Sequence, residues 1–141
     1  MNAATALVNA GVDVDEIREL LPSVEPHFVS VFAASEFARR FWAEGIVAVT
    51  MPWALYVTPA TFERIDAGDE PRRFGRLVVH ELVHLHQYRS AGAVPHVVRY
   101  CLDYLRGRMA GLGHWDAYLD VAAEVEARSL AGGIDISQGP R

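Results

Sequence analysis

Cysteine is almost missing from this sequence of 141 residues, in which Cys101 is the single example. A disulfide framework within one chain is therefore excluded, and we expect a reducing compartment with Cys101 as a buried structural thiol. No stretch approaches the roughly 18 uninterrupted apolar residues that a membrane span needs. The first residues also lack the basic start and apolar run of a secretory signal. These features predict a cytoplasmic protein with no membrane partner.

Positive charge is scarce and scattered along the chain. Lysine and arginine together number 13 against 18 acidic residues, which gives a formal net charge of -5. Because no basic block is present, we do not expect a nucleic-acid partner. Repeats, low-complexity segments and linkers are absent as well, and the composition is typical of a globular protein. The length predicts a single domain over residues 1–141, with an ordered core of about 14–131 and an undetermined oligomeric state.

Hydrophobic periodicity predicts an α+β fold with a small sheet of about three strands. The sheet is expected to pack on a central helix that carries the motif described below, with further helices after it. A polar connection is expected over residues 59–71. The predicted strands span residues 28–32, 46–51 and 54–58, and the predicted helices span residues 14–21, 36–44, 72–89, 97–108 and 114–130.

The central stretch, Leu77 to Gln87, reads LVVHELVHLHQ and contains H-E-x-x-H. On a helix, positions four apart lie about 40° apart around the axis and about 6 Å apart along it, so His80 and His84 can bind one metal ion. Glu81 points to one side of that pair and can reach a water molecule bound to the ion without being a ligand. The motif therefore predicts a zinc site with an adjacent general base.

Zinc needs a third protein ligand from elsewhere in the chain. The longer pattern H-E-x-x-H-x-x-G-x-x-H is absent, because Gln87 and Ser90 occupy its glycine and third histidine positions. His86 is turned about 120° and 160° from the two motif histidines, so a surface or supporting role is expected for it. His96 and His114 are further candidates, although neither belongs to a recognisable signature.

The last predicted helix supplies a better candidate ligand. Glu124 would share a face with Asp120 and Arg128, each four residues away, whereas Glu126 would point about 200° from Glu124. Only one of the two glutamates can easily face the metal. The alternative is that both are ordinary solvent-facing acids.

These stretches together resemble the gluzincin zinc metallopeptidases, particularly their compact minimal members. The resemblance covers roughly residues 28–131 and includes a strand-rich run (IVAVTMPWALYVTPATF), HELVHLHQ and, about forty residues later, E-x-E-A at Glu124. It implies a zincin-like fold and a third zinc ligand at Glu124. Some members have an aspartate four residues later, where this chain has Arg128; Asp120 is a possible substitute. The resemblance also implies that a strand at residues 54–57 pairs with an extended peptide.

The sequence therefore predicts a zinc metallopeptidase that hydrolyses a peptide or protein substrate, with Glu81 as the general base for a zinc-activated water. Tyr118, His114 and Arg128 are alternative oxyanion stabilisers. A non-catalytic alternative remains, in which the site is structural or degenerate and the protein serves as a binding or regulatory module. A fourth protein ligand such as His96 or His114 would favour a structural site.

Overall fold

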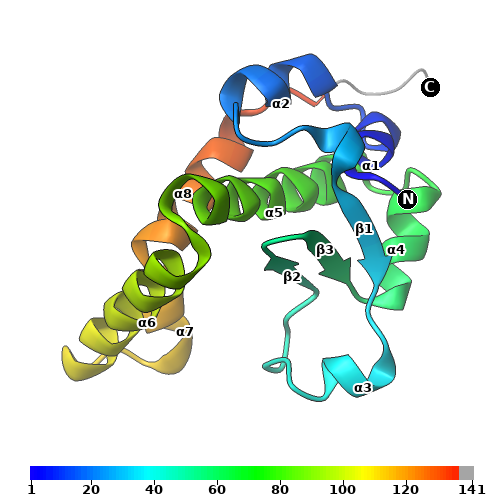
Figure 1. Cartoon of the computed structure of the whole chain (residues 1–141). Coiled ribbons are helices and arrows are strands. Elements are labelled where there is room, and N and C mark those ends of the chain that lie inside the picture. Colours follow the sequence, from blue (N-terminus) through cyan, green and yellow to red (C-terminus); the bar gives the residue numbers. More distant parts are fainter. Residues whose placement is uncertain (137–141) are drawn as a thin grey trace.

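The computed structural model describes residues 1–136, and Figure 1 shows their arrangement. Within these residues the chain forms eight α-helices, one short 3-10 helix and one three-stranded sheet. The predicted α+β class and small sheet are confirmed. None of these helices combines the length and apolar character needed to cross a membrane.

The sheet has the strand order β1-β3-β2. Strand β1 (Ser30–Ala33) pairs in parallel with β3 (Ala54–Val57), and β2 (Ala48–Met51) pairs with β3 in the antiparallel sense. Strands β2 and β3 form a hairpin that turns at Pro52 and Trp53. The 3-10 helix η1 (Pro26–Phe28) occupies the start of the first predicted strand.

Helix α5 (Pro71–Ala91) runs through the middle of the molecule and carries the H-E-x-x-H motif. It packs against α8 (Ala122–Gly133), α1 (Ala3–Asn9) and β2. Its apolar side chains are buried because neighbours cover it on several sides, and it ends where Gly92 adopts a φ of 84°. Helix α6 (Ala93–Met109) and α7 (His114–Leu119) project away from this core (Figure 1).

Several helices differ from the sequence prediction. Helix α1 forms where no element was predicted, and α4 (Pro59–Asp66) forms inside the predicted polar connection. Thr58 caps α4 with its hydroxyl, and Pro59 occupies the first turn, where a missing N–H costs no hydrogen bond. The predicted helix 114–130 is divided into α7 and α8 because Val121 is extended, with ψ of 127°.

The N-terminal helices are shorter pieces around the core. Helix α2 (Val14–Leu20) confirms the first predicted helix, whereas α3 (Glu36–Arg39) covers only the first part of the predicted 36–44. Buried residues also lie outside the expected core of about 14–131, including Leu7 and Ile136. The expectation of a buried thiol was wrong, because Cys101 is exposed on α6.

Candidate metal centre

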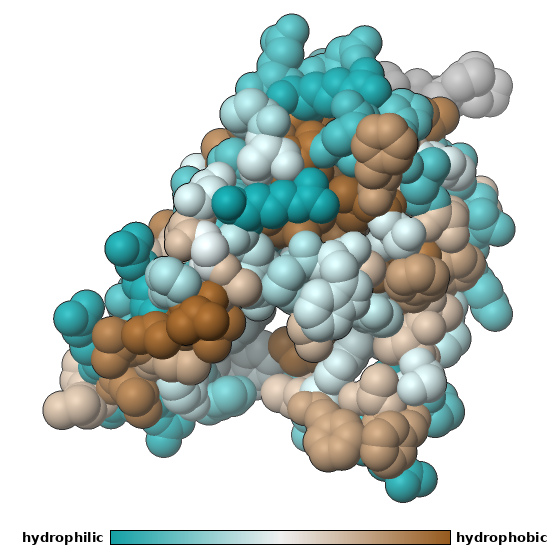
Figure 2. Space-filling model, viewed as in Figure 1, coloured by the Kyte–Doolittle hydropathy of each residue, from teal (hydrophilic) through white to brown (hydrophobic). Residues whose placement is uncertain are grey.

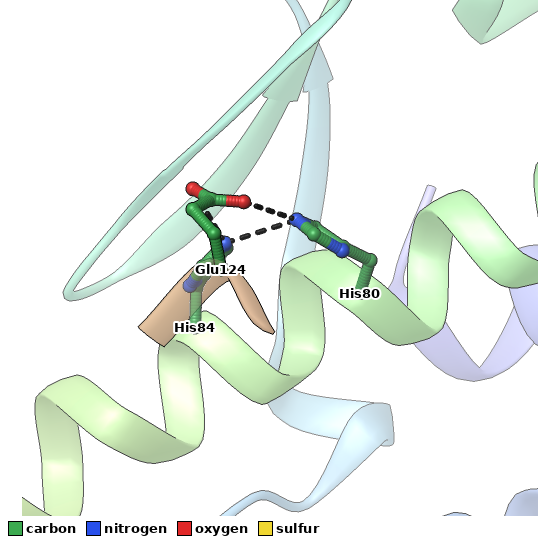
Figure 3. A group of neighbouring side chains, drawn as sticks. All are labelled: His80, His84 and Glu124. Atoms are coloured by element: carbon green, nitrogen blue, oxygen red, sulfur yellow. Dashed lines mark hydrogen bonds and ion pairs between the residues drawn. The ribbon is translucent and has the colours of Figure 1, made fainter. Parts of the chain in front are cut away.

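Helices α5 and α8 bring the three predicted ligands together (Figure 3). His80 and His84 project from one face of α5, with their Nε2 atoms 3.0 Å apart. Glu124 lies in the first turn of α8. Its Oε2 is 3.1 Å from Nε2 of His80, and its Oε1 is 3.3 Å from Nε2 of His84. One donor atom from each residue lies within 4.8 Å of the others, so the group could hold a metal ion.

The carboxylate of Glu124 is ionised although it is buried. Burial alone would raise its pKa, but the hydrogen bonds from His80 and His84 outweigh burial and hold the pKa far below its usual range. For His84, burial lowers the pKa, and the hydrogen bond to Glu124 together with the charge of Glu124 raises it to a net higher value. The three side chains therefore form a coupled cluster of charged and polar groups in an apolar setting.

Gln87 supports the cluster in a way that the sequence prediction missed. Its Oε1 accepts a hydrogen bond of 2.8 Å from Nδ1 of His84, which leaves Nε2 of that ring facing Glu124. Its Nε2 donates to the carbonyl of Ala123 at 3.1 Å and to Glu126 at 2.8 Å. Gln87 thus orients one candidate ligand and joins α5 to the helix that carries another. It replaces Asp120 in the supporting role, because Asp120 is exposed at the end of α7.

Glu81 is buried beside the candidate ligands and is held by the sheet. The hydroxyl of Thr50 on β2 donates to Glu81, with Oγ1 lying 2.6 Å from Oε2 and 3.0 Å from the main-chain carbonyl. Because Thr50 belongs to the strand next to α5, the position of the carboxylate depends on how the sheet packs on this helix. The predicted general base therefore has a fixed rather than a mobile side chain.

Two tyrosines from other helices reach Glu124. Tyr100 of α6 donates a hydrogen bond of 2.8 Å to Oε1 of Glu124. Tyr118 of α7 lies beside the same carboxylate and beside Tyr100. Burial, followed by the negative charge of Glu124, raises the pKa of both phenols, so both remain protonated donors at neutral pH. Tyr100 was absent from the sequence prediction, whereas Tyr118 was a candidate.

The remaining histidines lie outside the cluster. His86 bonds Ser23 at 2.6 Å, His96 packs its ring against Tyr88, and His114 bonds Tyr104 at 2.9 Å. Within residues 1–136 the candidate metal group contains two imidazoles and one carboxylate, and no fourth protein ligand joins them.

Two other candidate residues on α8, Arg128 and Glu126, also lie outside the metal cluster. Arg128 donates to the carbonyl of Leu119 and is exposed, so it joins α8 to α7. Glu126 is exposed and bonds Gln87, whereas Glu124 is only 3 % exposed. The structure therefore brings Glu124, and not Glu126, to the two motif histidines.

The strand next to the site is β2, and this corrects one expectation. Strand β3, which contains residues 54–57, lies between β1 and β2 and is paired on both edges. It has no free edge for a peptide. Strand β2 pairs only with β3 in the described sheet, so its outer edge, next to the site, could accept an added strand.

Two cavities border the cluster. The first, of about 760 Å³, contains His84, Glu81 and Glu124 and is called the apolar cavity here because its walls include Phe37, Phe41, Trp42, Ile46, Met51 and Val97. The second, of about 610 Å³, contains His80 and Glu81 and is called the arginine cavity because Arg64, Arg73, Arg76 and Arg128 line it. Glu81 and Tyr118 border both cavities.

No protein-family model, curated protein or solved structure matches this chain. The likeness to gluzincins consequently rests on the motif residues themselves.

Proposed function

We propose that this protein is a zinc-dependent, gluzincin-like peptidase. In this proposal His80, His84 and Glu124 bind the metal, and Glu81 is the general base. One observation carries the proposal: two imidazoles and a carboxylate from distant parts of the chain converge where two cavities meet. A site of this kind has three protein ligands and access for a substrate, which is the pattern of catalytic rather than structural zinc.

The kinds of donor atom, two imidazole nitrogens and a carboxylate oxygen, support zinc as the metal. Zinc bonds of about 2.0–2.1 Å in a tetrahedron place neighbouring ligand atoms about 3.3 Å apart. The Nε2 atoms of the two histidines are 3.0 Å apart, and one donor atom from each of His80, His84 and Glu124 lies within 4.8 Å of the others, which is close enough for one ion to bind all three. Magnesium and calcium prefer sites built from oxygen ligands, so two imidazole donors favour a transition metal.

The surrounding residues support hydrolysis. A zinc ion at this site would lower the pKa of water and polarise the scissile carbonyl. Glu81, held by Thr50, would accept the proton of the attacking water and deliver it to the leaving amine. Tyr118, which stays protonated and borders both cavities, would donate a hydrogen bond to the developing oxyanion. Tyr118 is better placed for this role than His114, which lines neither cavity, or Arg128, which lines only the arginine cavity.

A second candidate is a non-catalytic protein-binding module with a structural or degenerate site. The observation that favours it is the exposure of apolar side chains on α3, just after α3 and on α6, including Phe37, Phe41, Leu105 and Met109. Exposed apolar patches of this sort often mark a surface for another protein. The two experiments that follow, on zinc binding and on peptide hydrolysis, distinguish the peptidase from the binding module.

The first experiment measures zinc in protein purified without added metal and again after zinc is offered. The parent is expected to contain about one zinc per chain, and Glu124→Gln is expected to lose most of it because an amide is a poorer ligand than a carboxylate. Asp120→Ala is the matched control, since it removes an exposed acid four residues away and should keep the metal. A metal-free parent would contradict the proposal.

The second experiment measures hydrolysis of a peptide library by the zinc-loaded parent and by Glu81→Gln. The variant should keep its zinc and lose roughly 10²- to 10⁴-fold in turnover, which is the usual contribution of a general base. Equal turnover by parent and variant would refute the assigned role of Glu81. Zinc binding without any peptide hydrolysis by the parent would favour the binding module.

A further inference from the structure

The arginine cavity has an unusual charge for this protein. Four arginines line it, and the one carboxylate among its lining residues is Glu81, although the chain as a whole carries a formal charge of -5. The apolar cavity, by contrast, contains no arginine or lysine among its lining residues. The two cavities therefore differ in the kind of ligand that they favour: the arginine cavity favours an anionic group, and the apolar cavity favours a hydrophobic one.

Two of the four arginines already have carboxylate partners. Arg64 forms an ion pair with Glu70, and Arg73 forms another with the same residue at 3.2 Å. Arg128 donates to the carbonyl of Leu119, and Arg76 makes no hydrogen bond or ion pair within residues 1–136. Guanidinium groups without a carboxylate partner are suited to bind one from a ligand, often through two parallel hydrogen bonds.

Strand β2 gives the direction in which a peptide would lie. Residues 45–48 line the arginine cavity, whereas Ile46 and all of β2 line the apolar cavity, so the chain enters β2 beside the arginine cavity and continues along the apolar cavity. A peptide added to its outer edge in the antiparallel sense would run the opposite way. Its N-terminal part would lie in the apolar cavity, and its C-terminal part would reach the arginine cavity.

The apolar end is consistent with this orientation. Hydrophobic surface lies over α6 and over the region of α3, with a hollow between them (Figure 2). Phe37 and Phe41 of this region are 68 % and 77 % exposed, and both line the apolar cavity. An apolar peptide segment lying there would remove these rings from water.

We infer that the arginine cavity is a subsite for a carboxylate on the C-terminal side of the scissile bond, with Arg76 and Arg128 as its binding residues. This inference rests on the proposed peptidase function and specifies its substrate class. The carboxylate belongs either to an acidic side chain or to the C-terminus of the peptide, since both present the same group to a guanidinium.

The test uses synthetic peptides that have leucine and phenylalanine on the N-terminal side of the expected cleavage point. One pair carries glutamate or glutamine on the C-terminal side, and a second pair ends in a free carboxylate or an amide. The zinc-loaded parent should cleave one acid peptide at least tenfold more efficiently, in kcat/KM, than its neutral partner. The pair that shows this difference identifies the source of the carboxylate.

The arginines are tested with the same peptides. Arg76→Gln combined with Arg128→Gln should reduce the preference to less than about threefold, because the charge-assisted hydrogen bonds are lost. Arg72→Gln is the matched control: it makes the same change on an exposed residue of α5 that does not line the cavity, and it should retain the preference. Equal cleavage of acid and neutral peptides by the parent would overturn the inference.

A binding measurement separates failure of this inference from failure of the peptidase proposal. Fluorescence anisotropy with labelled peptides and the zinc-loaded Glu81→Gln variant needs no turnover. Tighter binding of the acid peptide that weakens with salt and disappears with the arginine substitutions supports the subsite even if the parent cleaves nothing. Equal affinity for acid and neutral peptides overturns the subsite even if the parent proves to be a peptidase.

Discussion

Helices α5 and α6 follow one another in the chain, are both rich in apolar residues, and have opposite environments. Ten residues of α5 are buried, whereas on α6 only Gly107 is buried. Helix α5 lies among α1, α8 and the sheet, while α6 packs mainly on the short α7. The number of covering neighbours, and not apolar composition, therefore decides which helix forms the core.

Because of this difference, α5 mainly determines the stability of the fold, whereas α6 mainly borders the cavity that a ligand would enter. The buried faces of α5 hold the fold and fix two of the candidate ligands, so changes there affect folding and metal binding together. Helix α6 contributes Val97 and Tyr100 to the apolar cavity while leaving most of its apolar surface in water. Substitutions on α6 should therefore cost less stability than substitutions on α5.

The largest expected effect is on stability. Leu82→Ala on α5 removes a fully buried side chain and should lower the free energy of unfolding by about 2–5 kcal/mol, because it loses burial and leaves a cavity. Leu105→Ala on α6 makes the same chemical change at a residue that is 52 % exposed, and should cost less than about 1 kcal/mol. Urea unfolding of the two variants measures the comparison directly. Similar losses would mean that α6 is covered in solution.

The second effect is on metal affinity. Gln87→Met keeps the volume of the side chain but removes its bonds to His84 and to α8, so zinc should bind about 10- to 100-fold more weakly. Gln87→Glu keeps an acceptor for His84 but places a second carboxylate beside Glu126. If ring orientation is what matters, this variant should bind zinc better than Gln87→Met.

Two controls make the Gln87 result specific. Ser90→Ala changes an exposed polar residue on the same helix and should leave zinc affinity as in the parent. Thermal unfolding of the metal-free proteins shows whether Gln87→Met has simply weakened the fold. A loss of stability with unchanged zinc affinity would assign Gln87 to helix packing alone.

The sequence predicted the elements whose signals are local. The central helix was expected at residues 72–89 and is found at Pro71–Ala91, and the two hairpin strands lie within their predicted ranges. Helix α4 was also predictable in principle, since Thr58 followed by Pro59 is a helix-start signal. Helix α1 was predictable too, since Asn2 caps it by accepting from the N–H of Thr5 and its first turn is rich in alanine, the best helix former.

The residues of the candidate site also differ in whether the local sequence reveals them. The motif gave His80 and His84, and the resemblance gave Glu124, all of which meet in the structure. Gln87 lies three residues after His84, so helical spacing could have revealed it. Tyr100 had no local signal, because its contact with Glu124 depends on how α6 folds back towards α8.

The smallest effect tests the close approach of α6 to α7 at Gly107. A Cβ added at Gly107 would lie 3.0 Å from Cβ and 3.1 Å from Cα of Ala117 on α7. Gly107→Ala should therefore destabilise the protein by about 1 kcal/mol, because the crowding outweighs the gain in helix propensity. Gly132→Ala on α8 meets nothing within 4 Å and should stabilise it by about 0.5–1 kcal/mol. Opposite signs in urea unfolding would show that α6 is anchored through Gly107, whereas stabilisation by both substitutions would mean that α6 and α7 are not closely packed.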